Sequence, residues 1–108
     1  MANAFKRSSV SSVSTSRQDA LAADVGASTE VVCIGMVASN KSASATTITV
    51  EINNGTNYYT YINECPLPVS SAVELLEGKL VLTQDDNIVI TAGDASAVDF
   101  TVSYLEIT

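Results

Sequence analysis

A turn signal between two alternating segments constrains the fold of this chain more than any other sequence feature. Apolar and polar side chains alternate along residues 46–53, and a second strand-like segment, residues 56–65, begins directly after Asn54-Gly55. Period-two alternation is typical of a half-buried β-strand. An Asn-Gly pair between two such segments favours a two-residue turn, because both central residues must adopt a positive φ. The sequence therefore predicts an antiparallel hairpin.

A two-residue turn also sets the expected register of this hairpin. Counting outward from Asn54-Gly55 pairs Val50 with Tyr59 on the core face. The same register places Tyr58 and Ile62 on the outer face, which is more apolar than contact with water requires. We therefore treat Tyr58 and Ile62 as candidate contacts with another subunit, although isolated exposed apolar side chains are ordinary.

Further short strands are expected on both sides of the hairpin. The nearly continuous apolar stretch 29–38 is typical of a strand covered on both faces, and Gly35 within it predicts a bulge. Pro66 and Pro68 predict a connecting loop. Other strands are expected at residues 73–76, 80–83, 88–91 and 98–107, with 18–25 as a weaker edge strand. These features predict an all-β fold, an antiparallel β-sandwich of about seven to eight short strands with an extended N-terminal arm.

Charge separates the beginning of the chain from the remainder. The basic side chains Lys6, Arg7 and Arg17 precede all twelve acidic residues of the sequence. We therefore divide the chain into a basic, serine-rich N-terminal arm, residues 1–17, and an acidic β-sandwich domain, residues 18–108. The arm has too few large apolar groups to order itself, so we expect a partner to order it through Phe5 and these basic residues. A disordered, solubilising tail is the alternative.

The residue types that catalysis and metal binding most often use are scarce. The sequence has no histidine, which excludes Ser-His-Asp and Cys-His arrangements within the chain. Cys33 and Cys65 without histidine cannot supply an ordinary zinc site, and we expect two free, packed thiols, with a bridge between them left open. Asp85 and Asp86 lack the ligand spacing of an EF-hand and predict a solvated turn. We expect no catalytic residue, no cofactor and no bound metal.

Composition also narrows the class of partner. A net charge of −7 argues against sequence-independent binding of nucleic acid, because phosphates would repel the acidic domain. No apolar stretch is long enough to cross a membrane, and none follows the basic start as a secretion signal would. We therefore expect a chain made in a cytoplasm that functions in binding or assembly.

Several segments together resemble small virion proteins of tailed bacteriophages. The resemblance spans most of the chain and is a pattern of strands and turns. It is carried by Phe5-Lys-Arg-Ser8, Val32-Cys-Ile-Gly35, Thr49-Val-Glu-Ile52, Asn57-Tyr-Tyr59, Pro66-Leu-Pro68, Glu77-Gly-Lys-Leu-Val-Leu82 and Val102-Ser-Tyr-Leu-Glu-Ile107. Where such proteins often carry Glu-Ala-Gly-Asp, this chain has Thr83-Gln-Asp-Asp86, so the turn geometry at that point is open.

The resemblance implies a structural role in a virion, in a particle assembled in the host cytoplasm. The leading hypothesis is a capsid decoration, or cement, protein that binds and stabilises the shell of major capsid protein. A homo-oligomer is expected, with a trimer as the class-based guess. A neck or tail protein (collar, terminator or fibre-attachment module) is the alternative. A carbohydrate-binding sandwich that uses Tyr58, Tyr59 and Tyr61 ranks third, because the chain has no Trp.

Overall fold

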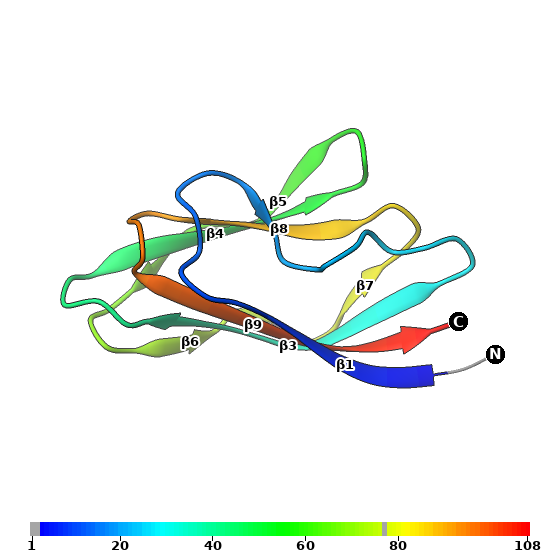
Figure 1. The fold of residues 1–108 in the computed structure, drawn as a ribbon, viewed down its shortest axis with the longest axis horizontal. Helices are drawn as coiled ribbons and strands as arrows, with labels where there is room; N and C mark the ends of the chain where they lie inside the picture. Colours follow the sequence, from blue (N-terminus) through cyan, green and yellow to red (C-terminus); the bar gives the residue numbers. More distant parts are fainter. Residues whose placement is uncertain (1–2, 77) are drawn as a thin grey trace.

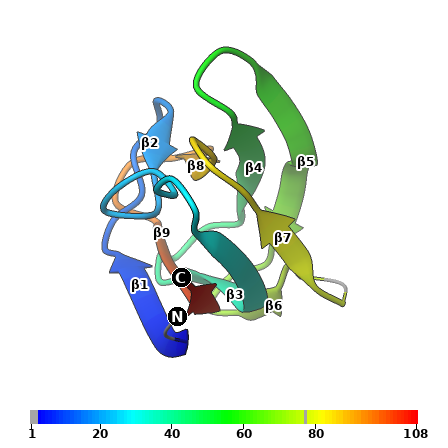
Figure 2. The same cartoon turned by 90° about the vertical axis from the view of Figure 1, so that its right-hand side faces the viewer.

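In the computed structural model, which describes residues 3–76 and 78–108, two antiparallel β-sheets pack face to face (Figures 1 and 2). The prediction of an all-β sandwich is confirmed. The described strands are β1 (Asn3–Val10), β2 (Gln18–Asp19), β3 (Glu30–Asn40), β4 (Thr46–Asn53), β5 (Tyr58–Leu67), β6 (Ala72–Glu74), β7 (Leu80–Leu82), β8 (Asn87–Ala92) and β9 (Val98–Ile107). Met1, Ala2 and Glu77, which belong to the expected arm and to one motif of the resemblance, lie outside the described residues.

The strand order defines two sheets. The first, here the β3 sheet, has the order β1-β9-β3-β6, and β7 also pairs with β3. The second, here the β4 sheet, has the order β2-β8-β4-β5. Their inner faces bury large apolar side chains from both layers, including Met36, Phe100, Val102, Ile48, Val50 and Ile90. Residues 3–76 and 78–108 contain no helix, so none that is long and apolar enough to cross a membrane.

Strand β3 confirms one prediction and corrects another. The register against β9 shifts between Cys33 and Gly35, which is the expected bulge. The backbone N–H of Met36 next to it donates to the Glu74 carboxylate at 3.0 Å. The expectation that both faces of this strand are covered is wrong, because Ile34 remains 47% exposed. Only one layer packs against the sheet, so its outer face is open.

The hairpin between β4 and β5 forms, but its register differs from the prediction. Val50 pairs with Ile62 instead of Tyr59. The cause is the side chain of Asn54, which accepts hydrogen bonds from the backbone N–H groups of Thr56 and Asn57 and widens the turn. Two further register shifts along the hairpin move the pairing still more.

The altered register changes where the hairpin side chains lie. Tyr59, expected in the core, is 55% exposed near the tip of the hairpin, which projects away from the β3 sheet (Figure 1). Ile62, expected on the outer face, is half-buried and packs against the core, since its partner Val50 points inward. Pro66 belongs to β5 and pairs with Thr47, because β5 is an edge strand that tolerates proline.

The expected arm is not a separate extension in this structure. Residues from Asn3 to Val10 form β1, which pairs along its whole length with β9 at the edge of the β3 sheet (Figure 2). Val13 is fully buried in the core. The proposed division after residue 17 therefore coincides with no structural boundary, and the first residues described are part of the sandwich.

Candidate interaction surface

An apolar row crosses the outer face of the β3 sheet from one edge to the other. Phe5 on β1 pairs with Leu105 on β9, Leu105 pairs with Val32 on β3, and Val32 pairs with Val81 on β7. We call these four residues the outer row. Directly opposed residues on adjacent strands lie close enough for their side chains to touch, so the four form a continuous surface feature.

The ends of the outer row are open to solvent. Phe5 is 78% exposed and Val81 is 57% exposed, whereas Val32 and Leu105 are half-buried. The flanking residues of β3, Val31 and Cys33, are buried on the inner side, which places Val32 on the outside. A sheet face in contact with water ordinarily carries polar side chains, so an uncovered apolar row is the feature of this molecule that most needs a partner.

An unpaired cation flanks the outer row at its Phe5 end. Arg7 lies two residues beyond Phe5 on β1, is exposed, and pairs across the sheet with Ser103. The three ion pairs of the described residues leave Arg7 out. A guanidinium beside an apolar surface favours a partner that offers a carboxylate next to apolar groups.

The other basic residues of the expected docking arm are engaged within the chain. The Lys6 ammonium lies 2.9 Å from the Glu106 carboxylate, and this hydrogen bond raises the pKa of Lys6. Arg17 forms an ion pair with Glu51. Of the residues expected to bind a partner, Phe5 and Arg7 therefore remain free for one, whereas Lys6 and Arg17 have partners in their own fold.

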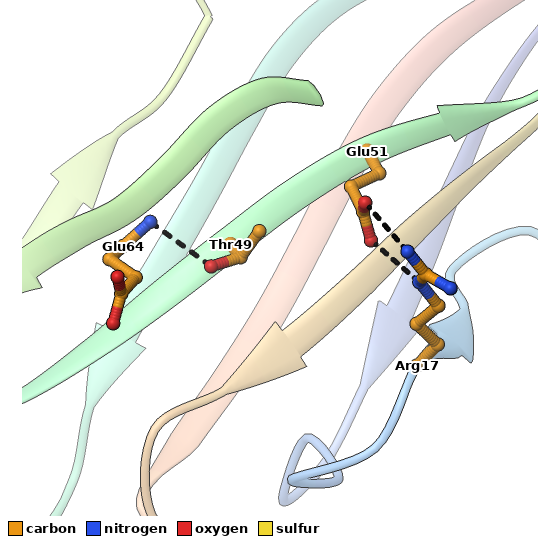
Figure 3. A network of polar contacts seen from close by, with 4 residues as sticks. All are labelled: Arg17, Thr49, Glu51 and Glu64. Atoms are coloured by element: carbon orange, nitrogen blue, oxygen red, sulfur yellow. Dashed lines mark hydrogen bonds and ion pairs between the residues drawn. The ribbon is translucent and has the colours of Figure 1, made fainter. Parts of the chain in front are cut away.

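The outer face of the β4 sheet is built differently. Arg17 donates from two nitrogens to the two carboxylate oxygens of Glu51, at 3.0 and 3.2 Å (Figure 3). Its guanidinium also stacks over the Tyr58 ring, 3.8 Å from the ring centre. The hydrogen bond to Glu51 raises the pKa of Arg17. Tyr58 thus lies on an outer face as expected, but part of its surface is already covered by the chain itself.

Polar side chains surround this arrangement. Four residues pair side by side across the four strands of the β4 sheet, in the order Asp19, Val89, Glu51 and Thr60. Of these, Val89 is buried. Farther along β4, the Thr49 hydroxyl accepts from the backbone N–H of Glu64 (Figure 3). The Arg17, Glu51 and Thr49 side chains of this face are thus bonded within the chain, and Val89 is covered.

A groove of about 510 Å³ opens between β5 and β6, at one side of the sandwich. Its lining residues are Tyr61, Ile62, Cys65, Val73, Glu74 and Leu75. The three tyrosines expected as a sugar platform are split, because Tyr61 faces this groove while Tyr58 lies beneath Arg17. They do not form one stacking surface.

The thiols and carboxylates are dispersed in the structure. Cys33 is buried and Cys65 is half-buried, and both are free thiols. Burial raises the pKa of Cys33 to about 11. Asp86 accepts from the Thr83 backbone N–H at 2.8 Å within a tight turn, as expected of a turn residue. In the part of the chain that the structure describes, no three Cys, Asp or Glu side chains gather into a metal-binding group.

The sequence alone does not reveal the outer row. It predicts Phe5 as a partner contact, but Val32, Val81 and Leu105 only as strand residues. Their alignment depends on the pairing of four strands that are distant in sequence, and local periodicity carries no information on that pairing. No family model, curated protein or solved structure matches this chain.

Proposed function

We propose that this chain is a structural protein of a bacteriophage virion, a capsid decoration (cement) protein that binds the major capsid protein through the outer row. The observation that carries the proposal is the uncovered line from Phe5 to Val81 on an otherwise well-packed sandwich. The resemblance of its strands and turns to small virion proteins supplies the class of partner.

The energetics suit a protein present in many copies. Complete burial of one large apolar side chain contributes on the order of 1.5–3 kcal/mol, so a few exposed residues give a weak single contact. Arg7 would add a charge-assisted hydrogen bond to a carboxylate of the partner. Repeated attachment around a symmetric shell converts weak contacts into firm binding, since each linked copy raises the effective concentration of the next.

The proposal is tested by loading purified protein onto capsid shells that lack it. A Val81→Glu variant places a charge in the outer row, and Thr60→Glu is the matched control, because Thr60 is exposed on the outer face of the other sheet. Val81→Glu should raise the dissociation constant for the shells at least about tenfold, which corresponds to roughly 1.4 kcal/mol. Thr60→Glu should bind like the unmodified chain, and equal loading of both variants would refute the proposed surface.

Copy number separates the two structural roles. Gel densitometry of complete virions should give hundreds of copies per particle for a decoration protein. A dozen copies or fewer would assign the chain to the neck or tail instead, which is the alternative role for a virion protein of this size.

A further inference from the structure

Strand β1 is attached to the sandwich mainly through its backbone. The five side chains from Asn3 to Arg7 are exposed, and only Ser8 and Val10 are half-buried. Side-chain contacts to the rest of the fold include the exposed ion pair of Lys6 and the hydrogen bond from Ser8 to a backbone carbonyl. The main attachment is the antiparallel ladder of backbone hydrogen bonds with β9. The same ladder forms whether β1 comes from the same copy of the chain or from a second copy.

The segment that follows β1 is short and strained. Ser12 has a φ of 55°, in the left-handed region that non-glycine residues rarely occupy. Its backbone N–H donates to Asp99 at 2.8 Å, and its hydroxyl accepts from Lys41 at 2.9 Å. One residue later the chain is fixed, because Val13 is buried and its N–H donates to the Val98 carbonyl at 2.7 Å. Ser11 and Ser12 therefore form a two-residue hinge between β1, which can detach from the sheet edge, and Val13, which is fixed in the core.

We propose that β1 exchanges between copies, so that β1 of one chain pairs with β9 of a second copy. Every contact between β1 and β9 is then remade across the two chains, with the same register and the same side chains. Only the hinge changes, and a short, strained hinge favours exchange because an extended hinge releases the positive φ of Ser12. The inference concerns this chain alone and does not depend on the proposed role in a virion.

Two hinge variants of the full chain test the role of Ser12. Proline cannot adopt a positive φ, so Ser12→Pro excludes the closed hinge, whereas Ser12→Gly accommodates it without strain. Analytical ultracentrifugation over a range of concentrations should show stronger self-association for Ser12→Pro than for the unmodified chain. Ser12→Gly should associate more weakly, by roughly tenfold for each of the two hinges that a reciprocal dimer opens, the factor that corresponds to a strain of about 1.4 kcal/mol per hinge. The reverse order, or no difference, overturns the proposal.

Cysteine pairing shows directly which strands meet, and it works with the natural hinge even where Ser12→Pro fails to fold. The Ser9 and Thr101 hydroxyls lie 3.1 Å apart across β1 and β9. In a Cys65→Ser background, one copy carries Ser9→Cys and the other carries Thr101→Cys, and the two are mixed at high concentration and oxidised. Exchange predicts a disulfide-linked heterodimer, identified by mass spectrometry.

The matched control replaces the second copy with one that carries Thr60→Cys. Thr60 is exposed on the β4 sheet and has no place in the β1–β9 ladder. A yield for the Ser9→Cys and Thr101→Cys pair several-fold above this control supports exchange. Equal yields mean that the cross-links come from random collisions, and β1 then stays with its own chain.

Discussion

The outward faces of the two sheets differ in how their side chains are satisfied. On the β4 sheet, Arg17 binds Glu51 through two hydrogen bonds and stacks on Tyr58, so the charges and the aromatic ring are engaged within the chain. On the β3 sheet, the outer row ends in Phe5 and Val81, which are largely exposed and contact no covering layer.

This difference shows which of the two faces is the better candidate for binding a partner. The sequence predicts a charged contact, because three basic residues lie near its start. The fold engages Lys6 and Arg17 with its own carboxylates, and exposed ion pairs contribute little stability or specificity in any case. The surface that lacks an internal partner is apolar, and Arg7 beside it belongs to none of the three ion pairs of the described residues. The candidate interface is therefore defined by unsatisfied apolar area more than by charge.

The largest effect is expected on the inner side of β4. Val50 is fully buried, and its neighbour Glu51 points to the opposite face. Val50→Asp should lower the free energy of unfolding by at least about 3 kcal/mol, because an unpaired carboxylate would replace buried methyl groups. Urea denaturation measures the change. Thr60→Asp on the outer side of the same hairpin should cost no more than about 1 kcal/mol, the most expected from a carboxylate opposite Glu51, and a similar loss in both variants would contradict the assigned faces.

A smaller loss is expected where the β4 face engages its own charges. Arg17→Ala removes the bidentate ion pair and the stacking on Tyr58, and leaves Glu51 without a cation. The midpoint of urea denaturation should fall by less than in Val50→Asp, with capsid loading unchanged. Arg17→Lys should recover part of the loss, since an ammonium keeps the charge but not the paired geometry. Reduced loading at unchanged stability would instead assign Arg17 to the interface.

The sandwich itself could be predicted from local patterns. Alternation and turn residues located the strands at 46–53 and 98–107 and the bulge at Gly35. These features depend on neighbours in sequence, which is the range over which side-chain periodicity and backbone preference act. The fold class follows from the number and spacing of such segments.

Register and faces could not be predicted in the same way. The hydrogen bonds of the Asn54 side chain widen the turn by two residues, which places Tyr59 opposite Ile52 near the tip of the hairpin instead of opposite Val50. The register shift between Glu51 and Val50 then moves β5 by one residue and turns Ile62 toward the core, because a shift of one residue reverses the side chains beyond it. The sequence does not predict β1 as a strand either, because a polar strand at a sheet edge forms through backbone hydrogen bonds and needs little apolar content.

A pH effect is expected at the hinge that joins β1 to the core. Asp99 accepts from Lys41 and from the Ser12 backbone N–H, and these bonds lower the pKa of Asp99. Because the pKa of Asp99 is lower in the folded state, its carboxylate stabilises the fold at pH values above the ordinary pKa of Asp. This contribution is lost as the pH falls through the lowered pKa of Asp99. Asp99→Asn should cost a few tenths of a kcal/mol at pH 7, since the group is exposed and screened. The difference in the free energy of unfolding between Asp99→Asn and the unmodified chain should disappear near pH 2. A difference that stays constant with pH would contradict this role of Asp99.

A small effect on stability, but different effects on capsid loading, are expected for a pair of exposed aromatic residues. Phe5→Ala in the outer row and Tyr59→Ala on the β4 hairpin should each change the free energy of unfolding by less than about 0.5–1 kcal/mol, because both rings are largely in solvent. Capsid loading should separate them. Phe5→Ala should weaken attachment, since the ring loses the apolar area that the partner would cover, whereas Tyr59→Ala should load normally. Equal weakening in both variants would mean that any exposed ring contributes to attachment, and it would contradict a specific role for the outer row.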